Sequence, residues 1–220
     1  SRSAVKIAVD MVKEKLINKN DAILRVDPNS LDTLLHPTLD ERSLIKVIAN
    51  GLPASPGAVS GKVVFSSEEA ERLNDMMQDT ILVRVETSPE DIQGMHAAKG
   101  ILTSRGGMTS HAAVVARGMG RPCVSGSSEI EISYDKKVFK TSSAEIKEGE
   151  TITIDGSTGR IILGTVPTIK PEISGDFSKL MSWADKIRKL KVRTNSETPL
   201  DTKTARDFGA EGIGLCRTEH

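Results

Sequence analysis

The stretch GGMTSHAAVVARG, residues 106–118, places a histidine between two adjacent glycines and an apolar run that ends at another glycine. Adjacent glycines allow backbone conformations with positive φ and let another molecule approach closely. A hydroxyl group of Thr109 or Ser110 can accept hydrogen bonds from the free N–H groups of a following helix. The pattern therefore predicts a helix with His111 in its first turn and Gly118 or Gly120 at its end.

The start of this helix is suited to a phosphate that reacts with the histidine. Helix N-termini present unpaired N–H groups and a partial positive charge, which together favour an anion. The same field favours a neutral imidazole, whose nitrogen can attack phosphorus to give a phosphohistidine. Gly106, Gly107 and Ser110 would then form a loop that cradles the phosphoryl oxygens. From the residues alone, a first-turn histidine that only caps or packs is an equally good interpretation.

The apolar run that follows His111 has two kinds of side chain. Ala112 and Ala113 are small, so we expect them to leave a flat surface on which a phosphoryl donor could dock. Val114 and Val115 are larger, and we expect them to face the protein core.

The segments around this stretch combine helix and strand patterns. TILVRV and GILTS predict strands, and SEEAERLNDM and SPEDIQGMHAAK predict helices that begin at Ser67 and Ser88. TITIDGSTGRIILG predicts a hairpin. Apolar periodicity predicts an earlier helix over residues 5–16, and a shorter one follows with Pro28 at its first position and Pro37 at its stop. The sequence therefore predicts a mixed α/β fold around one small sheet.

The last part of the sequence indicates a second structural region. Residues 167–190 run from a proline-marked extended segment into a helix. LKVRTN, TPLDTKTARDFGA and EGIGLCRT then predict strand, helix and strand over about 30 residues, the length of one βαβ unit. One such unit cannot bury both faces of a sheet, so we expect the sequence to be a segment of a longer chain.

Composition argues against several classes of partner. Lys and Arg total 30 and balance 30 Asp and Glu, and aromatic residues make up 3% of the chain. The chain therefore lacks the basic excess that would favour nucleic acid or an anionic membrane. It also has few aromatic side chains that could stack on bases. No apolar run approaches the roughly 20 residues that span a bilayer. Cys123 and Cys216 are far apart in the sequence and match neither a metal site nor a disulfide framework. This pattern is typical of a reducing compartment, so we expect a cytoplasmic protein.

Two motifs carry a resemblance to a known family. GGMTSHAAVVARGMGRPCVSG resembles the phosphohistidine signature of the phosphoenolpyruvate (PEP)-utilising enzymes, and GLCRTEH resembles the opening of their PEP-binding barrel. The residues of these two motifs are most similar to those of the branch that converts ATP, phosphate and pyruvate to AMP, diphosphate and PEP. PEP synthase, which uses water in place of phosphate, is the alternative within the family. A non-catalytic module that binds an anion reversibly is the alternative from another class.

The resemblance implies an α/β architecture with four parts. Residues 1–40 would be the tail of, or linker from, an ATP-grasp domain, and residues 41–166 would be a swivelling β/β/α phosphohistidine domain. Residues 167–190 would be a linker helix, and residues 191–220 would be the first βαβ unit of a (β/α)8 barrel that binds PEP or pyruvate. His111 would carry first a pyrophosphoryl and then a phosphoryl group between the ATP and pyruvate sites.

The same resemblance assigns roles to single residues. His111 matches the phosphoryl carrier, and Thr109 matches a threonine that a regulatory kinase and phosphorylase modify in some members. Arg217 matches an arginine that contacts the PEP phosphate, and Arg193 is a further candidate for substrate binding because it ends the first predicted barrel strand. No metal ligand is expected in this chain, since the Mg²⁺ ligands of the full-length enzyme, a homodimer, would lie outside it. The segment alone should not turn over.

Overall fold

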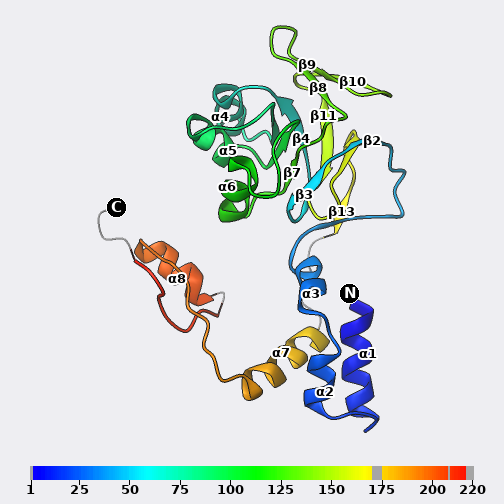
Figure 1. Ribbon diagram of the computed structural model, residues 1–220, viewed down its shortest axis with the longest axis vertical. Coiled ribbons are helices and arrows are strands. Elements are labelled where there is room, and N and C mark those ends of the chain that lie inside the picture. The colour runs from blue at the N-terminus through cyan, green and yellow to red at the C-terminus, as the bar shows by residue number, and fades with distance from the viewer. Residues whose placement is uncertain (1, 170–174, 208, 217–220) are drawn as a thin grey trace. The chain divides into compact units, whose positions relative to one another are not determined.

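The computed structural model describes residues 2–169, 175–207 and 209–216. Two compact units divide the chain. Unit 1 contains Asp27–Ile173, with the first two residues, and unit 2 contains Ser3–Val26 together with Ser174–His220. Figure 1 shows the sheet in unit 1, and helices are the main elements of unit 2.

Unit 1 is built on a mixed sheet of eight strands. Its centre is parallel and consists of β4 (Ala58–Val64), β5 (Thr80–Arg84), β6 (Gly100–Thr103) and β7 (Cys123–Ser125). Beside β4 the antiparallel strands β11 (Thr151–Asp155), β12 (Arg160–Leu163) and β2 (Val47–Asn50) follow in that order, and β3 (Leu52–Ser55) pairs with β7 at the other edge.

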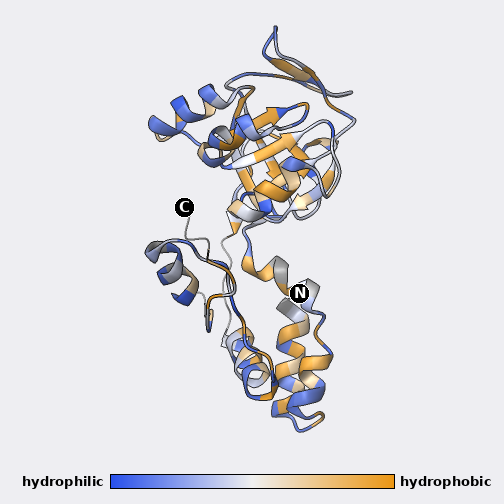
Figure 2. Ribbon diagram, turned by 60° about the vertical axis from the view of Figure 1, so that its left-hand side comes forward, coloured by the Kyte–Doolittle hydropathy of each residue, from blue (hydrophilic) through white to orange (hydrophobic). Residues whose placement is uncertain are grey.

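Three helices connect the parallel strands and cover one face of the sheet (Figure 1). They are α4 (Ser67–Asp75), α5 (Ile92–Ala97) and α6 (His111–Met119), and a 3₁₀ turn at Pro89–Asp91 precedes α5. Strand residues alternate between the two faces, as the pleat requires. Val64, Leu82 and Ile101 pack on the helix side, whereas Val63, Ile81 and Leu102 pack on the other. In Figure 2 the strands of the large sheet carry mostly hydrophobic residues, whereas the helices also carry many hydrophilic ones.

A small antiparallel sheet supplies part of the core on the face away from the helices. Its strands are β8 (Glu131–Ser133), β9 (Val138–Lys140) and β10 (Glu145–Lys147), in the order β10-β9-β8. Phe139 and Ile146 from this sheet are buried with Val83 and Leu102 of the large sheet. Unit 1 also contains α3 (Pro28–Leu35) and the pair β1 (Thr38–Leu39) and β13 (Thr168–Ile169).

Unit 2 contains α1 (Arg2–Lys13) from Ser3 onward, α2 (Lys19–Leu24), α7 (Gly175–Ile187) and α8 (Pro199–Asp207). Val9, Ala22 and Leu180 are buried within it. The Lys19 ammonium lies 5.8 Å from the centre of the Trp183 ring, a favourable cation–π distance. The segments on either side of α8 run parallel, with an isolated bridge between Thr194 and Ile213. Backbone hydrogen bonds join them from the Glu211 N–H group to the Val192 carbonyl through to the Ser196 N–H group and the Leu215 carbonyl.

Most of the predicted elements are present, and the mixed α/β fold is confirmed. The hairpin is β11 and β12, and α3 begins at Pro28. The first helix ends at Lys13 rather than at Leu16, because Lys15 adopts a φ of 59°. The cap of α4 is Ser66, whose hydroxyl accepts a hydrogen bond from the Glu69 N–H group. The two strands predicted around α8 are present as hydrogen-bonded parallel segments with one isolated bridge rather than as full strands. Two adjacent segments without further neighbours bury neither face of a sheet.

The predicted faces of α6 are wrong for Ala112, Ala113 and Val114, whereas Val115 is partly buried and packs against the core as expected. Ala112 and Ala113 are 2% and 0% exposed and belong to the core beside the sheet, whereas Val114 is 53% exposed. Their small side chains let α6 pack closely on β3 and β7. The alanines therefore determine how near the helix comes to the sheet, and they offer no docking surface.

The two cysteines should react very differently with alkylating reagents. Cys123 is fully buried, and burial raises the pKa of its thiol from 9.0 to about 12, whereas Cys216 is exposed. At neutral pH we expect iodoacetamide to label Cys216 quickly and Cys123 only after unfolding, because the thiolate is the nucleophile. Mass spectrometry of peptides from the native protein, with Cys216→Ser as the control, measures this. Equal labelling of both thiols in the folded protein would contradict the described core.

The raised pKa of Cys123 also gives unit 1 a defined response to alkali. The neutral thiol favours the native state below the unfolded pKa of 9.0, and its contribution is lost as the pH rises toward about 12.

Candidate functional site

The loops that follow β5 and β6 lie side by side at the carboxyl edge of the parallel strands. Hydrogen bonds continue the pairing beyond both strands, from the Ser104 N–H group to the Arg84 carbonyl at 3.2 Å and from the Arg105 N–H group to the Val85 carbonyl at 2.9 Å. Open α/β sheets bind ligands at this edge. The strand pairing therefore brings residues 85–88 close to residues 104–110.

His111 is the first residue of α6, as the sequence predicts. Ser110 is its N-cap, and the Ser110 hydroxyl accepts a hydrogen bond from the Ala113 N–H group at 3.4 Å. Gly120 ends the helix in the left-handed conformation, with a φ of 65°. Of the caps considered from the sequence, the structure thus has Ser110 rather than Thr109 at the start and Gly120 at the end.

The imidazole of His111 is held by Thr87. The Thr87 hydroxyl oxygen lies 2.9 Å from Nδ1 of His111, and Thr87 is 9% exposed. A hydroxyl can accept or donate, so this contact suits either neutral tautomer. When Nδ1 carries the proton and donates to Thr87, the lone pair of Nε2 is free to act as a nucleophile. The arrangement can therefore direct phosphoryl transfer to Nε2.

A small hollow of about 220 Å³ adjoins His111. Its lining consists of Glu86, Thr87, Arg105, Gly106, Ser110, His111 and Ala112. Arg105 and Glu86 are both exposed there, so one cation and one carboxylate flank the imidazole. The hollow is large enough for a phosphoryl group beside the ring.

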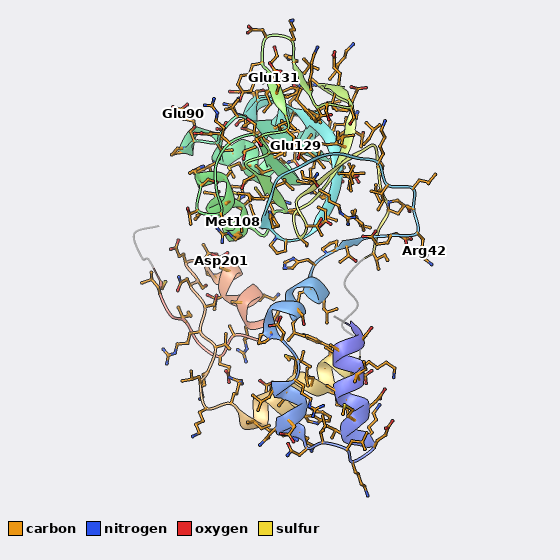
Figure 3. All side chains as sticks on the ribbon, turned by 45° about the vertical axis from the view of Figure 1, so that its right-hand side comes forward. Arg42, Glu90, Met108, Glu129, Glu131 and Asp201 are labelled. Atoms are coloured by element: carbon orange, nitrogen blue, oxygen red, sulfur yellow. The ribbon has the colours of Figure 1, made fainter. Side chains whose placement is uncertain are left out.

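The loop before His111 is tied down through its carbonyl groups. The Ser125 hydroxyl donates to the Gly107 carbonyl at 3.4 Å, and the Thr103 hydroxyl donates to the Arg105 carbonyl at 2.8 Å. The Arg117 guanidinium donates to the Met108 carbonyl from the last turn of α6. In Figure 3, Met108 lies at the opposite end of unit 1 from Glu131 of β8.

Two glycines allow this loop to pack closely against the residues around it. Gly106 has a φ of +100°, and a Cβ atom there would lie 2.8 Å from the Ser110 Cβ atom. Gly126 has a φ of +61°, and a Cβ atom there would collide with the Gly106 carbonyl oxygen. Both positions therefore require glycine for its conformation and for its lack of a side chain.

The other predicted site residues either do not line the hollow or lie outside the described residues. Thr109 and Gly107 are exposed in the loop and do not line the hollow. Arg193 is exposed in unit 2, beside the bridge at Thr194. Arg217 lies outside the described residues.

Two further properties concern ligands and membranes. Among the residues that the structure describes, His, Cys, Asp and Glu side chains form no group of three or more that could hold a metal ion. Within the same residues, no helix is both long enough and apolar enough to cross a membrane.

Sequence reasoning missed Thr87 and Glu86. Their position directly after a predicted strand was the available signal, because loops at the carboxyl ends of adjacent parallel strands meet. Using that signal requires the order of the strands in the sheet, which the sequence pattern did not provide.

Comparison with known families assigns both parts of the chain. Residues 76–159 match the family model described as the mobile domain of PEP-utilising enzymes, and residues 171–220 match the model of their PEP-binding domain. The chain belongs to the PEP-utilising enzymes. The mobile-domain match contains His111 and every residue that lines the hollow.

Individual PEP-utilising enzymes are similar over the whole chain. The identity is 59% over 220 residues to pyruvate, phosphate dikinase of Rhizobium meliloti (strain 1021) and 58% over 221 residues to pyruvate, phosphate dikinase 2 of Zea mays. It is 55% to pyruvate, phosphate dikinase of Clostridium symbiosum, over 99% of this chain. The chain spans 24% of the first relative and 25% of each of the other two, about a quarter of their length.

Gly126→Ala should disturb the loop that carries His111, whereas Gly120→Ala should not. Both glycines have positive φ, so either alanine costs about 1 kcal/mol of backbone strain. Only the Gly126 methyl group meets the Gly106 carbonyl, and we expect an additional loss of roughly 1–3 kcal/mol from overpacking. Urea unfolding and the imidazole NMR signals of His111 measure the two effects. Equal stability losses with unchanged His111 signals would argue against the close fit.

Proposed function

We propose that this chain is the phosphoryl-carrier region of a pyruvate, phosphate dikinase, with His111 as the carrier. The observation that carries the proposal is the position of His111 at the start of α6, with Nδ1 2.9 Å from the Thr87 hydroxyl and an open hollow beside the ring. The full-length enzyme would convert ATP, phosphate and pyruvate to AMP, diphosphate and PEP. The similar dikinases support this choice over PEP synthase.

The transfer would proceed in three steps at Nε2 of His111. Nε2 attacks the β-phosphorus of ATP, a P–N bond forms, and the bond to the bridging oxygen of AMP breaks. Inorganic phosphate takes the terminal phosphoryl group and leaves as diphosphate. The remaining phosphoryl group passes from Nε2 to the enolate oxygen of pyruvate.

Local groups would assist these steps. The free N–H groups at the start of α6 stabilise phosphoryl oxygens, and Gly106 lets the donor approach the loop closely. Gly107 and Ser110 would complete the cradle. Arg105 is exposed at the hollow and attracts the negative donor.

We propose that the residues that bind the metal lie outside this chain. A PEP-utilising kinase uses a divalent metal to neutralise phosphate charge, and Mg²⁺ is the ion we propose. The described residues do not fit a metal site, because no suitable cluster of ligands is present among them. No step above therefore depends on a metal ligand from this chain.

The domain boundaries and remaining partners follow from the same proposal. Residues 41–166 would swivel between an ATP-grasp domain, whose tail or linker is residues 1–40, and a PEP-binding barrel that begins at residues 191–220. Residues 167–190 would be the linker helix. Arg217 and Arg193 would bind substrate in the barrel, and the full-length enzyme would be a cytoplasmic homodimer.

Labelling of the full-length enzyme tests the carrier directly. With ATP labelled on its β-phosphate, we expect an acid-labile label on the peptide of residues 106–117, which trypsin releases by cleavage after Arg105 and Arg117. The label should be abolished in His111→Ala, because His111 is the one histidine of this peptide. Acid-stable label on Thr109 or Ser110, or no label, would contradict the proposal, and the latter would favour a reversible anion-binding module.

A negative charge at Thr109 should inhibit the carrier. Thr109 is exposed two residues before His111, and a phosphate there would add roughly −1.5 to −2 charge. We expect Thr109→Asp to slow the labelling of His111 by about tenfold through charge repulsion, and the neutral isostere Thr109→Asn to change it little. Rapid-quench measurement of labelled enzyme compares the two variants. The same slowing in both would refute an electrostatic effect.

A further inference from the structure

A tyrosine from the small antiparallel sheet reaches the loop that holds Thr87. Tyr134 is the one tyrosine of the sequence and follows β8 directly. Its hydroxyl oxygen accepts a hydrogen bond of 2.7 Å from the Val85 N–H group. Val85 is the first residue after β5 and stands two residues before Thr87. The small sheet therefore contacts the start of the loop segment 85–88.

The other end of this segment is fixed by Asp91. The Ser88 N–H group donates to one carboxylate oxygen of Asp91 at 2.9 Å, and the Ser67 hydroxyl donates to the other at 3.0 Å. Asp91 is only 5% exposed. Segment 85–88 is thus anchored at both ends, with Thr87 between the two anchors.

Arg84 connects the two anchors. Its guanidinium carbon lies 5.0 Å from the centre of the Tyr134 ring, and its Nε atom lies 3.4 Å from the Asp91 carboxylate. Its Nη1 atom donates to the Phe65 carbonyl at 2.9 Å, which ties the guanidinium to the backbone after β4. The tyrosine ring and the carboxylate therefore pack against one cation whose position the sheet determines.

We propose that Tyr134 is a positioning residue for His111. Its hydroxyl fixes the start of segment 85–88 and thereby holds the Thr87 hydroxyl against Nδ1 of His111. Hydrogen bonds weaken steeply when their distance or angle departs from the optimum, so a small shift of the segment releases the imidazole. This inference rests on the proposed role of His111 as the phosphoryl carrier.

The first test is Tyr134→Phe in the full-length enzyme, which removes the hydroxyl and keeps the ring over Arg84. We expect the labelling of His111 to become about threefold to tenfold slower, the rate equivalent of one neutral hydrogen bond. NMR of ¹⁵N-labelled histidine should show a smaller fraction of the Nδ1–H tautomer at His111. A purely structural role for the ring would leave both measurements unchanged.

A double-mutant cycle tests whether Tyr134 acts through Thr87. Thr87→Val should cause the same two changes more strongly, and Thr87→Ser should restore both toward the original values. Adding Tyr134→Phe to Thr87→Val should then have no further effect, because the contact through which it acts is gone. Effects that multiply in the double variant would overturn the proposal.

Thr141→Val is the matched control for a general loosening of the small sheet. The Thr141 hydroxyl accepts hydrogen bonds from the Ser143 and Ala144 N–H groups, at 3.2 and 3.0 Å, in the turn between β9 and β10. Its loss should leave the rate and the tautomer of His111 unchanged, and an effect equal to that of Tyr134→Phe would overturn the specific role of Tyr134. If the unaltered enzyme shows no label on His111, the proposed function fails, whereas the tautomer measurement still decides the role of Tyr134.

Discussion

The parallel pairing of β5 with β6 is the constraint on which the candidate site depends. It brings two loops that are distant in sequence to the same edge of the sheet, and hydrogen bonds of Ser104 and Arg105 extend the pairing past the strand ends. The Thr87 contact with His111 exists only because this register is maintained. A shift of the pairing by one residue would turn the neighbouring side chains to opposite faces and separate the two groups.

The packing of α6 then sets where His111 lies. Ala112, Ala113 and Ala116 are buried against the sheet, so the helix axis comes close to β3 and β7. His111 consequently begins the helix directly beside the carboxyl edge. The same approach requires glycine at position 126, where the backbone of the preceding loop leaves no room for a side chain.

Local patterns predicted much of this arrangement, and long-range contacts account for what they missed. The loop, the cap at Ser110 and the helix start at His111 depend on neighbours within a few residues, which the sequence displays. Thr87 is 24 positions from His111, and Tyr134 is 49 positions from Val85, so their contacts depend on strand order and register. The positions of Ala112, Ala113 and Val114 on α6 were misjudged for a related reason, because close packing on a sheet selects small side chains where larger apolar ones would ordinarily indicate the core.

Tyr134 and Trp183 also give the chain a built-in pair of optical reporters. The sequence contains one tyrosine and one tryptophan, and they fall in unit 1 and unit 2 respectively. Tryptophan emission excited at long wavelength arises from unit 2 alone, whereas excitation of tyrosine begins in unit 1. Energy transfer from the tyrosine to the tryptophan depends on their separation, so the intrinsic fluorescence of this chain carries information on the distance between its two units without any added dye.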